Sequence, residues 1–232
     1  MNKAKFFLIF LPILFIGNKE LSQKSNLLPN SFFNFFNQKV YANDLEQFYR
    51  NRCHSKDKSG DYLGAIQDCN KAIEINPNEG TTYTMRGDAK AGLKDYSGAM
   101  SDYNRSLSIN GLHHFLTYAS IGYLKYDIKD YKGSIEIWNK VIEDSPSWSI
   151  PYLNIGNAKI KLKDYVGAKI AYKKAIERDP NSPDAYVNLM KLKGELLKPK
   201  EACLYGRQAI NLGYQNQTLV KYICDFAAKY KP

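Results

Sequence analysis

The chain has 232 residues, with 33 Lys and Arg against 23 Asp and Glu, and carries a formal net charge of +10. Its lysines are scattered rather than gathered into a tight basic cluster with interleaved exposed aromatics, which disfavours a nucleic-acid-binding protein. The length is sufficient for one elongated domain.

The first 17 residues have the pattern of a secretory signal. Lys3 and Lys5 precede an apolar run over residues 6–17, which is too short for a transmembrane helix of about 20 residues. Residues 18–42 show no helical period, and the tripeptide that ends at Ala42 favours cleavage there. We therefore expect residues 18–42 to be a leader that is removed and the protein to be exported to a periplasm, a lumen or the outside of the cell. The alternative is an uncleaved N-terminal segment that anchors the protein to a membrane.

From residue 43 onward the sequence repeats itself. One column consists only of tyrosines, separated by 34, 35, 34 and 34 residues: Tyr49, Tyr83, Tyr118, Tyr152 and Tyr186. A second column holds mostly small residues: Cys53, Gly87, Gly122, Gly156 and Met190. A third holds mostly aromatic ones: Cys69, Tyr103, Trp138, Tyr172 and Gly206. A fixed period of this length indicates a stack of small repeated units.

The spacing within each unit predicts two helices. Tyr152, Ile155 and Gly156 fall on one face of a first helix, and Ala168 and Tyr172 share one face of a second. Small residues let two helices approach closely, and the aromatic side chains fill the space beside them. Each buried aromatic then contributes roughly 1.5–3 kcal/mol.

Helix boundaries are predicted from capping residues and prolines. Ser182 is the expected N-cap of a helix that starts at Pro183. Asn76 precedes Pro77 and is therefore pushed out of the helical region, so a helix should end there. Each unit is helix, short turn, helix.

These columns resemble the tetratricopeptide repeat (TPR) family from about Asp44 to Tyr214, and we take residue 43 as the start of the array. The fifth unit departs from the family pattern at Met190 and Gly206. The resemblance implies an all-α, right-handed superhelix of about five helix-turn-helix repeats. The expected repeats span residues 46–79, 80–114, 115–148, 149–182 and 183–214.

Residues 215–232 are expected to form a capping helix. Leu219, Ile223, Phe226 and Tyr230 lie on one stripe, and a repeat array needs a terminal element that covers its last apolar face. A membrane-active amphipathic helix is the other interpretation of this stripe.

The resemblance also suggests how the four cysteines pair. Cys53 and Cys69 occupy two columns that touch each other in the family, so we expect a disulfide between them. Cys203 and Cys224 form a second candidate pair. Export would permit both bridges; the alternative is reduced cysteines packed as small hydrophobes.

Motifs of catalysis are absent from the sequence. It contains no HExxH, no glycine-rich phosphate loop, no serine elbow and no CxxC. We therefore expect no enzyme activity, no catalytic residue, no cofactor, no metal site and no small-molecule substrate.

In this family the inner faces of the first helices line a concave groove, and the resemblance therefore implies a groove here. Its centre is apolar and aromatic, and such an exposed patch favours a binding site. The expected groove residues are Leu116, Ala119, Tyr123, Tyr126, Ile150, Leu153, Asn154, Asn157, Ile160 and Asn188. A curvature tight enough to close the groove is the alternative.

The sequence thus predicts a non-catalytic scaffold that binds a protein or peptide partner. An assembly factor or holdase that uses the same groove is one alternative, and a TPR protein associated with nucleic acid is another. Membrane contact is expected only through the N-terminal segment, if that segment is retained.

Overall fold

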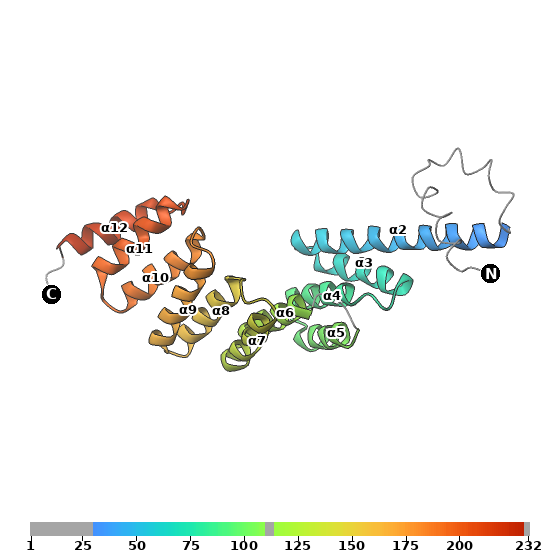
Figure 1. The fold of residues 1–232 in the computed structure, drawn as a ribbon, viewed down its shortest axis with the longest axis horizontal. Helices are drawn as coiled ribbons and strands as arrows, with labels where there is room; N and C mark the ends of the chain where they lie inside the picture. The colour runs from blue at the N-terminus through green and yellow to red at the C-terminus, as the bar shows by residue number, and fades with distance from the viewer. Residues whose placement is uncertain (1–29, 110–113, 230–232) are drawn as a thin grey trace, which may run out of the picture.

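The computed structural model describes residues 30–109 and 114–229, and this part of the chain consists of eleven helices joined by short turns. The helices stack in chain order into one elongated array (Figure 1). Their bounds are α2 Asn30–Lys58, α3 Tyr62–Ile75, α4 Gly80–Gly92, α5 Tyr96–Ser108, α6 His114–Asp127, α7 Tyr131–Asp144, α8 Ile150–Lys161, α9 Tyr165–Arg178, α10 Pro183–Glu195, α11 Pro199–Asn211 and α12 Gln217–Lys229.

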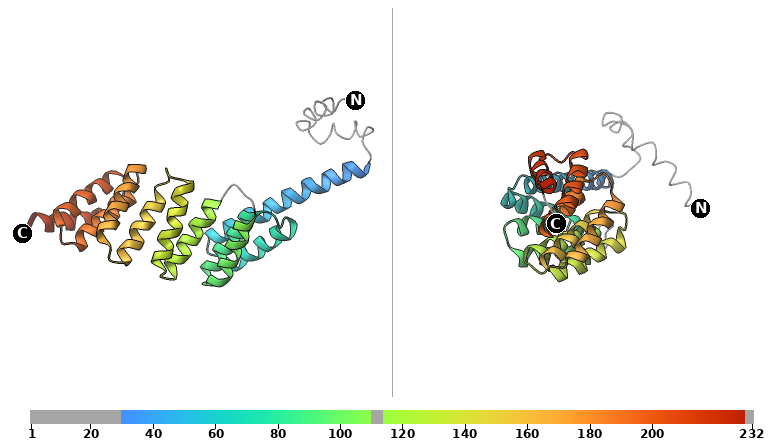
Figure 2. Two further views of the ribbon diagram at one scale, coloured as in Figure 1. Left: turned by 60° about the horizontal axis from the view of Figure 1, so that its bottom comes forward. Right: turned by 90° about the vertical axis from the view of Figure 1, so that its left-hand side faces the viewer.

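The predicted all-α fold is confirmed. Helices pair as α2 with α3, α4 with α5, α6 with α7, α8 with α9 and α10 with α11, and each pair packs on the next. The pairs lie side by side, and successive pairs are rotated, as the turned views show (Figure 2). Asn76 caps the C-terminus of α3, and α10 begins at Pro183 with Ser182 as its N-cap. The Ser182 side chain, however, makes no capping hydrogen bond.

Helix α2 differs from the sequence expectation. It starts at Asn30, so the part of the leader from Asn30 to Ala42 is helical and continuous with the first helix of repeat one. The helix extends well beyond its partner α3 (Figure 1). The absence of an apolar period in this stretch does not prevent a helix, and the removal of the leader stays a prediction. The predicted signal, residues 1–17, and residues 18–29 lie outside the described residues.

One compact turn joins the two helices of each repeat, and repeat three illustrates it. Lys129 takes a left-handed conformation, φ 66°, and its N–H donates to the Tyr126 carbonyl at 2.9 Å. The next N–H, of Asp130, donates to the Lys125 carbonyl at 2.8 Å, which completes a Schellman-type C-cap. The Asp130 carboxylate then accepts from the Gly133 N–H at 2.9 Å and so caps the following helix. Asp130 therefore ends one helix and starts the next.

The same turn recurs in the other repeats of the array. Asp61, Asp95 and Asp164 cap α3, α5 and α9 in the same way. The glycine at the third helical position is required, because a Cβ on Gly133 would lie 2.2 Å from an Asp130 carboxylate oxygen. In repeat five Leu197 has φ 52°, and Lys198 replaces the capping Asp without a side-chain cap.

The core of each repeat is a small residue packed against a large one. A Cβ on Gly156 would lie 2.3 Å from the ring of Tyr172, so only glycine fits beneath that ring. Trp138 packs in the same way over Gly122 and is fully buried. Repeat five reverses the sizes, since Met190 fills the space left by Gly206. Each pair of columns therefore keeps a workable combined volume although the residues change.

Helix α12 covers the end of the array. Val220 and Ala227 are buried, and Leu219 and Ile223 pack against the cluster formed by α10 and α11. Phe226, expected on the buried stripe, is 51% exposed, so the buried stripe is rotated from the predicted one. Tyr230 lies outside the described residues.

Candidate protein-binding surface

The exposed part of the predicted groove is centred on α6. Leu116 is 44% exposed and Tyr123 is 47% exposed, and the two lie seven residues apart on one helix face. On the neighbouring α8, Ile150, Asn154, Asn157 and Ile160 are half-buried. Leu116 and Tyr123 thus provide the most accessible apolar area among the expected groove residues.

Two expected groove residues belong to the core instead. Ala119 is 5% exposed and packs with Trp138, and Leu153 is 8% exposed and packs with Tyr172 and Leu189. Both positions lie on the inner side of a first helix, but the adjoining repeat covers them. Neither side chain is available to a partner, which corrects the expectation from the sequence.

The remaining expected residues are partly used within the fold. The rings of Tyr126 and Tyr131 meet edge to face with centroids 5.2 Å apart. Tyr123 contacts Trp138 in the same manner, at 4.9 Å. The exposed side of Tyr123 is therefore held in one orientation by a buried ring, which limits the entropy that a partner would have to remove.

Amide side chains connect successive first helices. Asn154 Nδ2 donates to Tyr123 Oη at 3.3 Å, and Asn188 Nδ2 donates to Asn157 Oδ1 at 3.3 Å. The two residues of each pair are 31 positions apart in the sequence, and this offset brings equivalent faces of neighbouring repeats together. Tyr172 Oη also donates to Asn157 Oδ1, at 2.9 Å. These amides, which the sequence suggested as partner ligands, first of all link α6, α8 and α10.

Repeats one and two carry a more acidic inner face. Tyr103 Oη donates to Asp88 Oδ1 at 2.8 Å, and Ser120 also hydrogen-bonds this carboxylate. Burial raises the pKa of Asp88, and burial is likewise the largest cause of the raised pKa of Asp57. Burial, followed by the nearby Asp88 charge, raises the pKa of Tyr103. Both carboxylates are half-buried on the first helices of their repeats.

A network of hydroxyl groups crosses the junction of repeats two and three. Thr84 Oγ1 lies 2.8 Å from both Ser106 Oγ and Thr117 Oγ1, and all three side chains are buried. Hydroxyls can donate and accept, so the three groups satisfy one another. Ser106 lies in a column that is apolar in the other repeats, with Ala72, Val141, Ala175 and Ala209, and the sequence alone did not predict this network.

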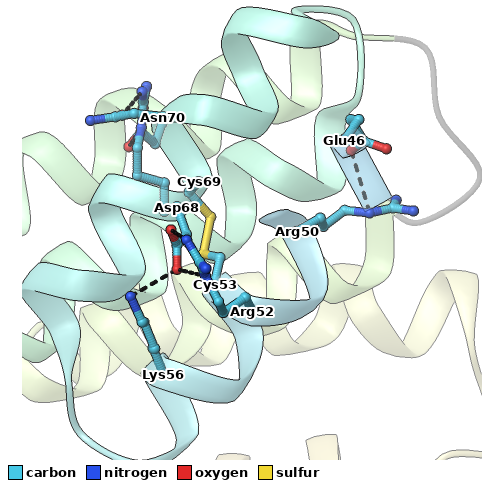
Figure 3. The surroundings of a disulfide bond; sticks show 10 residues. Glu46, Arg50, Arg52, Cys53, Lys56, Asp68, Cys69 and Asn70 are labelled. Atoms are coloured by element: carbon cyan, nitrogen blue, oxygen red, sulfur yellow. Dashed lines mark hydrogen bonds and ion pairs between the residues drawn. A yellow bond between two sulfur atoms is a disulfide. The ribbon is translucent and has the colours of Figure 1, made fainter. Parts of the chain in front are cut away.

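The N-terminal repeat contains the first cysteine pair (Figure 3). Cys53 and Cys69 are fully buried, with sulfur atoms 2.08 Å apart, at disulfide-bonding distance. Beside them the Asp68 carboxylate accepts from Arg52 at 2.6 and 2.7 Å and pairs with Lys56 at 2.9 Å. The Arg52 hydrogen bonds, more than any other interaction, lower the pKa of Asp68 to about 2. The two cysteines take the place of the small and aromatic columns of later repeats.

The second cysteine pair ties the cap to the array. Cys203 on α11 and Cys224 on α12 lie with sulfur atoms 1.95 Å apart. A groove of about 670 Å³ runs between the same two helices, with Arg207, Thr218 and Lys221 among its lining residues. Both cysteine pairs suggested by the sequence are thus brought together at the two ends of the array.

The described ranges 30–109 and 114–229 contain no group of three or more His, Cys, Asp or Glu that could hold a metal ion. Within the same ranges, none of the helices is both long and apolar enough to cross a membrane.

Comparison with known proteins supports the fold. PilF of Pseudomonas aeruginosa superposes with a TM-score of 0.68 at 18% identity, covering 82% of this chain and 90% of PilF. PilW, described as a widely conserved type IV pilus biogenesis factor, gives 0.67 at 19% identity, covering 79% and 84%. MamA of Desulfovibrio magneticus RS-1, from residue 41 to its end, gives 0.60 at 21% identity, covering 73% and 95%. At these identities the likeness concerns the fold alone. No curated protein matches the sequence.

The repeats themselves are identified by sequence. The family description "Tetratricopeptide repeat" matches residues 54–79, 80–111 and 151–182, which are parts of the predicted repeats one, two and four. Repeats three and five have the same helix pairs in the structure although this match does not include them. The chain thus contains tetratricopeptide repeats over these three stretches, within an array of like helix pairs.

Proposed function

We propose that the protein is an exported scaffold that binds a segment of a partner protein along the inner face of α6 and α8. The observation that carries the proposal is the exposure of Leu116 and Tyr123, 44% and 47%, on one face of helix α6. Ile150 and Ile160 on α8 are half-buried beside them and would widen the apolar contact. Large apolar side chains grouped on a surface commonly mark a binding site.

Polar groups on the same face favour a peptide backbone as the ligand. Asn157 uses its carbonyl oxygen for Tyr172 and Asn188, and its Nδ2 group remains as a donor directed away from those two bonds. Asn154 uses Nδ2 for Tyr123, and its carbonyl oxygen remains as an acceptor. One donor and one acceptor, a helical turn apart, match the alternating groups of an extended backbone.

The cysteines support export. Two pairs at disulfide-bonding distance are uncommon in a reducing compartment, whereas secreted and periplasmic domains retain such bridges. Cleavage after Ala42 would shorten α2, and an uncleaved chain would stay attached to a membrane through its N-terminal segment. Under both outcomes the array faces an oxidising compartment.

An assembly factor is the second candidate function. The array has the same fold as PilW, which is described as a type IV pilus biogenesis factor. In that role the partner segment would be a subunit held before its assembly. The same α6 and α8 face would be used.

The test compares two exposed-residue variants of the full chain. Leu116→Ala with Tyr123→Ala should weaken the partner's Kd by at least about tenfold, since buried aromatic and aliphatic anchors dominate binding energy. Leu63→Ala with Ile128→Ala is the matched control, because those side chains are also exposed, at 66% and 44%, but lie away from this face. The partner would be captured by the wild-type chain, identified by mass spectrometry, purified and titrated.

Thermal unfolding of both variants checks the folded state. Leu153→Ala is unsuitable for this test, because its buried side chain would cost about 2–5 kcal/mol in stability on its own. An unchanged Kd for the α6 variant, with the fold intact, would reject the proposed face.

A further inference from the structure

The outer side of repeats four and five differs from the outer side of repeats two and three. On α9, Val166 is 73% exposed and Ile170 is 53% exposed, one helical turn apart. On α11, Leu204 occupies the position equivalent to Ile170 and is 56% exposed. Three aliphatic side chains thus lie on the outward faces of the second helices of repeats four and five, and we call this set the outer apolar patch.

The equivalent positions in repeats two and three are polar. The residues that correspond to Val166 and Ile170 are Ser97 and Ser101 on α5, and Lys132 and Glu136 on α7. The repeat fold therefore does not require apolar residues at these positions. The patch is an addition that packing within the array does not explain.

Basic side chains surround the patch. Lys173 continues the Val166–Ile170 stripe, and Lys200 and Arg207 lie one turn before and one turn after Leu204 on α11. All three are exposed. The acidic residues on the same stripes are Glu177 and Glu201, and Glu201 is paired with Lys193. The rim therefore carries a net positive charge, which complements an anionic surface.

The boundary between α9 and α11 is closed by an ion-pair cluster. Glu201 on α11 pairs with the buried Lys193, and Lys198 Nζ lies 3.9 Å from Glu201 Oε1. The Lys193 hydrogen bond, with Lys169 of α9 among the further cations, lowers the pKa of Glu201. Charged groups therefore lie at the boundary between the two helices. The aliphatic side chains stand on both sides of it, an arrangement better suited to a broad, deformable surface.

We propose that the outer apolar patch of repeats four and five contacts an anionic lipid bilayer. Val166, Ile170 and Leu204 would enter the interfacial region of the lipids, while Lys173, Lys200 and Arg207 would pair with the lipid phosphates. The inner face of α6 and α8 would then point away from the membrane. This contact is independent of the N-terminal segment and of the proposed partner site.

Vesicle binding by the full chain tests the proposal. The wild-type protein should partition more strongly onto vesicles of equimolar phosphatidylcholine and phosphatidylserine than onto phosphatidylcholine alone. The variant Val166→Ser, Ile170→Ser, Leu204→Ser should lower this partition coefficient by about tenfold, and so should Lys173→Glu, Lys200→Glu, Arg207→Glu. The matched control, Leu63→Ser with Lys132→Glu, changes an exposed aliphatic and a basic residue on other second helices and should keep wild-type binding.

A reporter locates the contact and separates it from binding through the N-terminal segment. Ile170→Trp should be quenched by brominated lipids, whereas Leu63→Trp should give the wild-type signal. Equal vesicle binding by the patch variants and the control would overturn the proposal, as would equal quenching at the two reporter positions. Loss of partner capture with undiminished vesicle binding would also overturn it, by assigning the patch to a protein. Circular dichroism of each variant establishes that the helices are intact.

Discussion

Repeats one and two differ from repeats three to five in one contact between the first and the second helix of the repeat. In repeats one and two a buried aspartate on the second helix meets an arginine on the first, as Asp102 does with Arg86 at 2.6 and 2.9 Å. In repeats three to five both positions are uncharged. The first-helix residues there are Ile121, Ile155 and Leu189, and the second-helix residues are Ile137, Ala171 and Tyr205.

A lysine present in every repeat changes its partner accordingly. Lys90 pairs with the buried Asp102 at 2.7 Å, and Lys56 does the same with Asp68. In repeats three and four, where that aspartate is absent, Lys125 and Lys159 pair with the aspartates that cap the second helices, at 2.7 and 2.6 Å. The repeat backbone therefore accepts a charged or an apolar contact at this position, provided that both partners change together.

The largest expected effect comes from breaking one such pair. Asp102→Ile alone should lower the free energy of unfolding by about 3–5 kcal/mol, because Arg86 would be left largely buried without its carboxylate. Arg86→Ile combined with Asp102→Ile copies repeat three and should be within about 1 kcal/mol of the wild type, or more stable. Urea denaturation measures both values.

Lys90 provides an internal check on this prediction. In the double variant it should pair with Asp95, the counterpart of Asp130, and the variant Asp95→Asn should then cost more stability than it does in the wild type. A double variant as unstable as Asp102→Ile would contradict the equivalence of the two kinds of repeat.

A smaller effect is expected from the Cys53–Cys69 pair, which replaces the glycine–aromatic contact of repeats two and four. A bridge across 16 residues should contribute about 3 kcal/mol, so Cys53→Ala with Cys69→Ala should lose about that amount. Cys53→Gly with Cys69→Tyr should lose less, since the ring refills the core. Thermal melts with and without reductant measure the difference, together with the mass change on reduction. A wild-type melt that reductant leaves unchanged would argue against the bridge.

The smallest effect is a pH dependence that comes from the buried Asp68 of repeat one, a position that holds Ile137 in repeat three. The pKa of Asp68 is lowered to about 2 from its ordinary value near 4, so its pairing stabilises the fold fully above about pH 4 and is lost as the pH falls toward 2. The contribution is at most about 2 kcal/mol. Asp68→Asn should remove this part of the acid dependence, which is followed by urea denaturation between pH 2 and 6.

The loss of stability at acidic pH has other contributors, which the Asp68→Asn variant retains. Hydrogen bonds from Lys125 and Lys159 lower the pKa values of Asp130 and Asp164, so stability should still fall in acid. If the free energy of unfolding of Asp68→Asn fell with decreasing pH as steeply as that of the wild type, the Arg52 contact would not act on stability.

The sequence was sufficient for the helical pairs, because the period and the small and aromatic columns come directly from residue types. It did not predict the helix over Asn30–Ala42, since no apolar period marks that stretch. The family resemblance predicted Ala119 and Leu153 as groove residues, but it carries no information on how closely the next repeat approaches. The burial of both residues depends on that approach. The capping role of Asp130 and its counterparts depends on hydrogen bonds that the repeated letters alone do not identify.

The shared turn has a consequence for how the array can vary in length. Within each repeat the connection has three residues, as in Ser59–Asp61, and in repeats one to four one aspartate closes the first helix and opens the second. Between repeats the connection has four or five residues, and the 35-residue spacing of the second repeat arises there. Insertions and deletions should therefore be tolerated at the junctions between repeats and rejected inside them, so that a longer or shorter relative would gain or lose whole helix pairs.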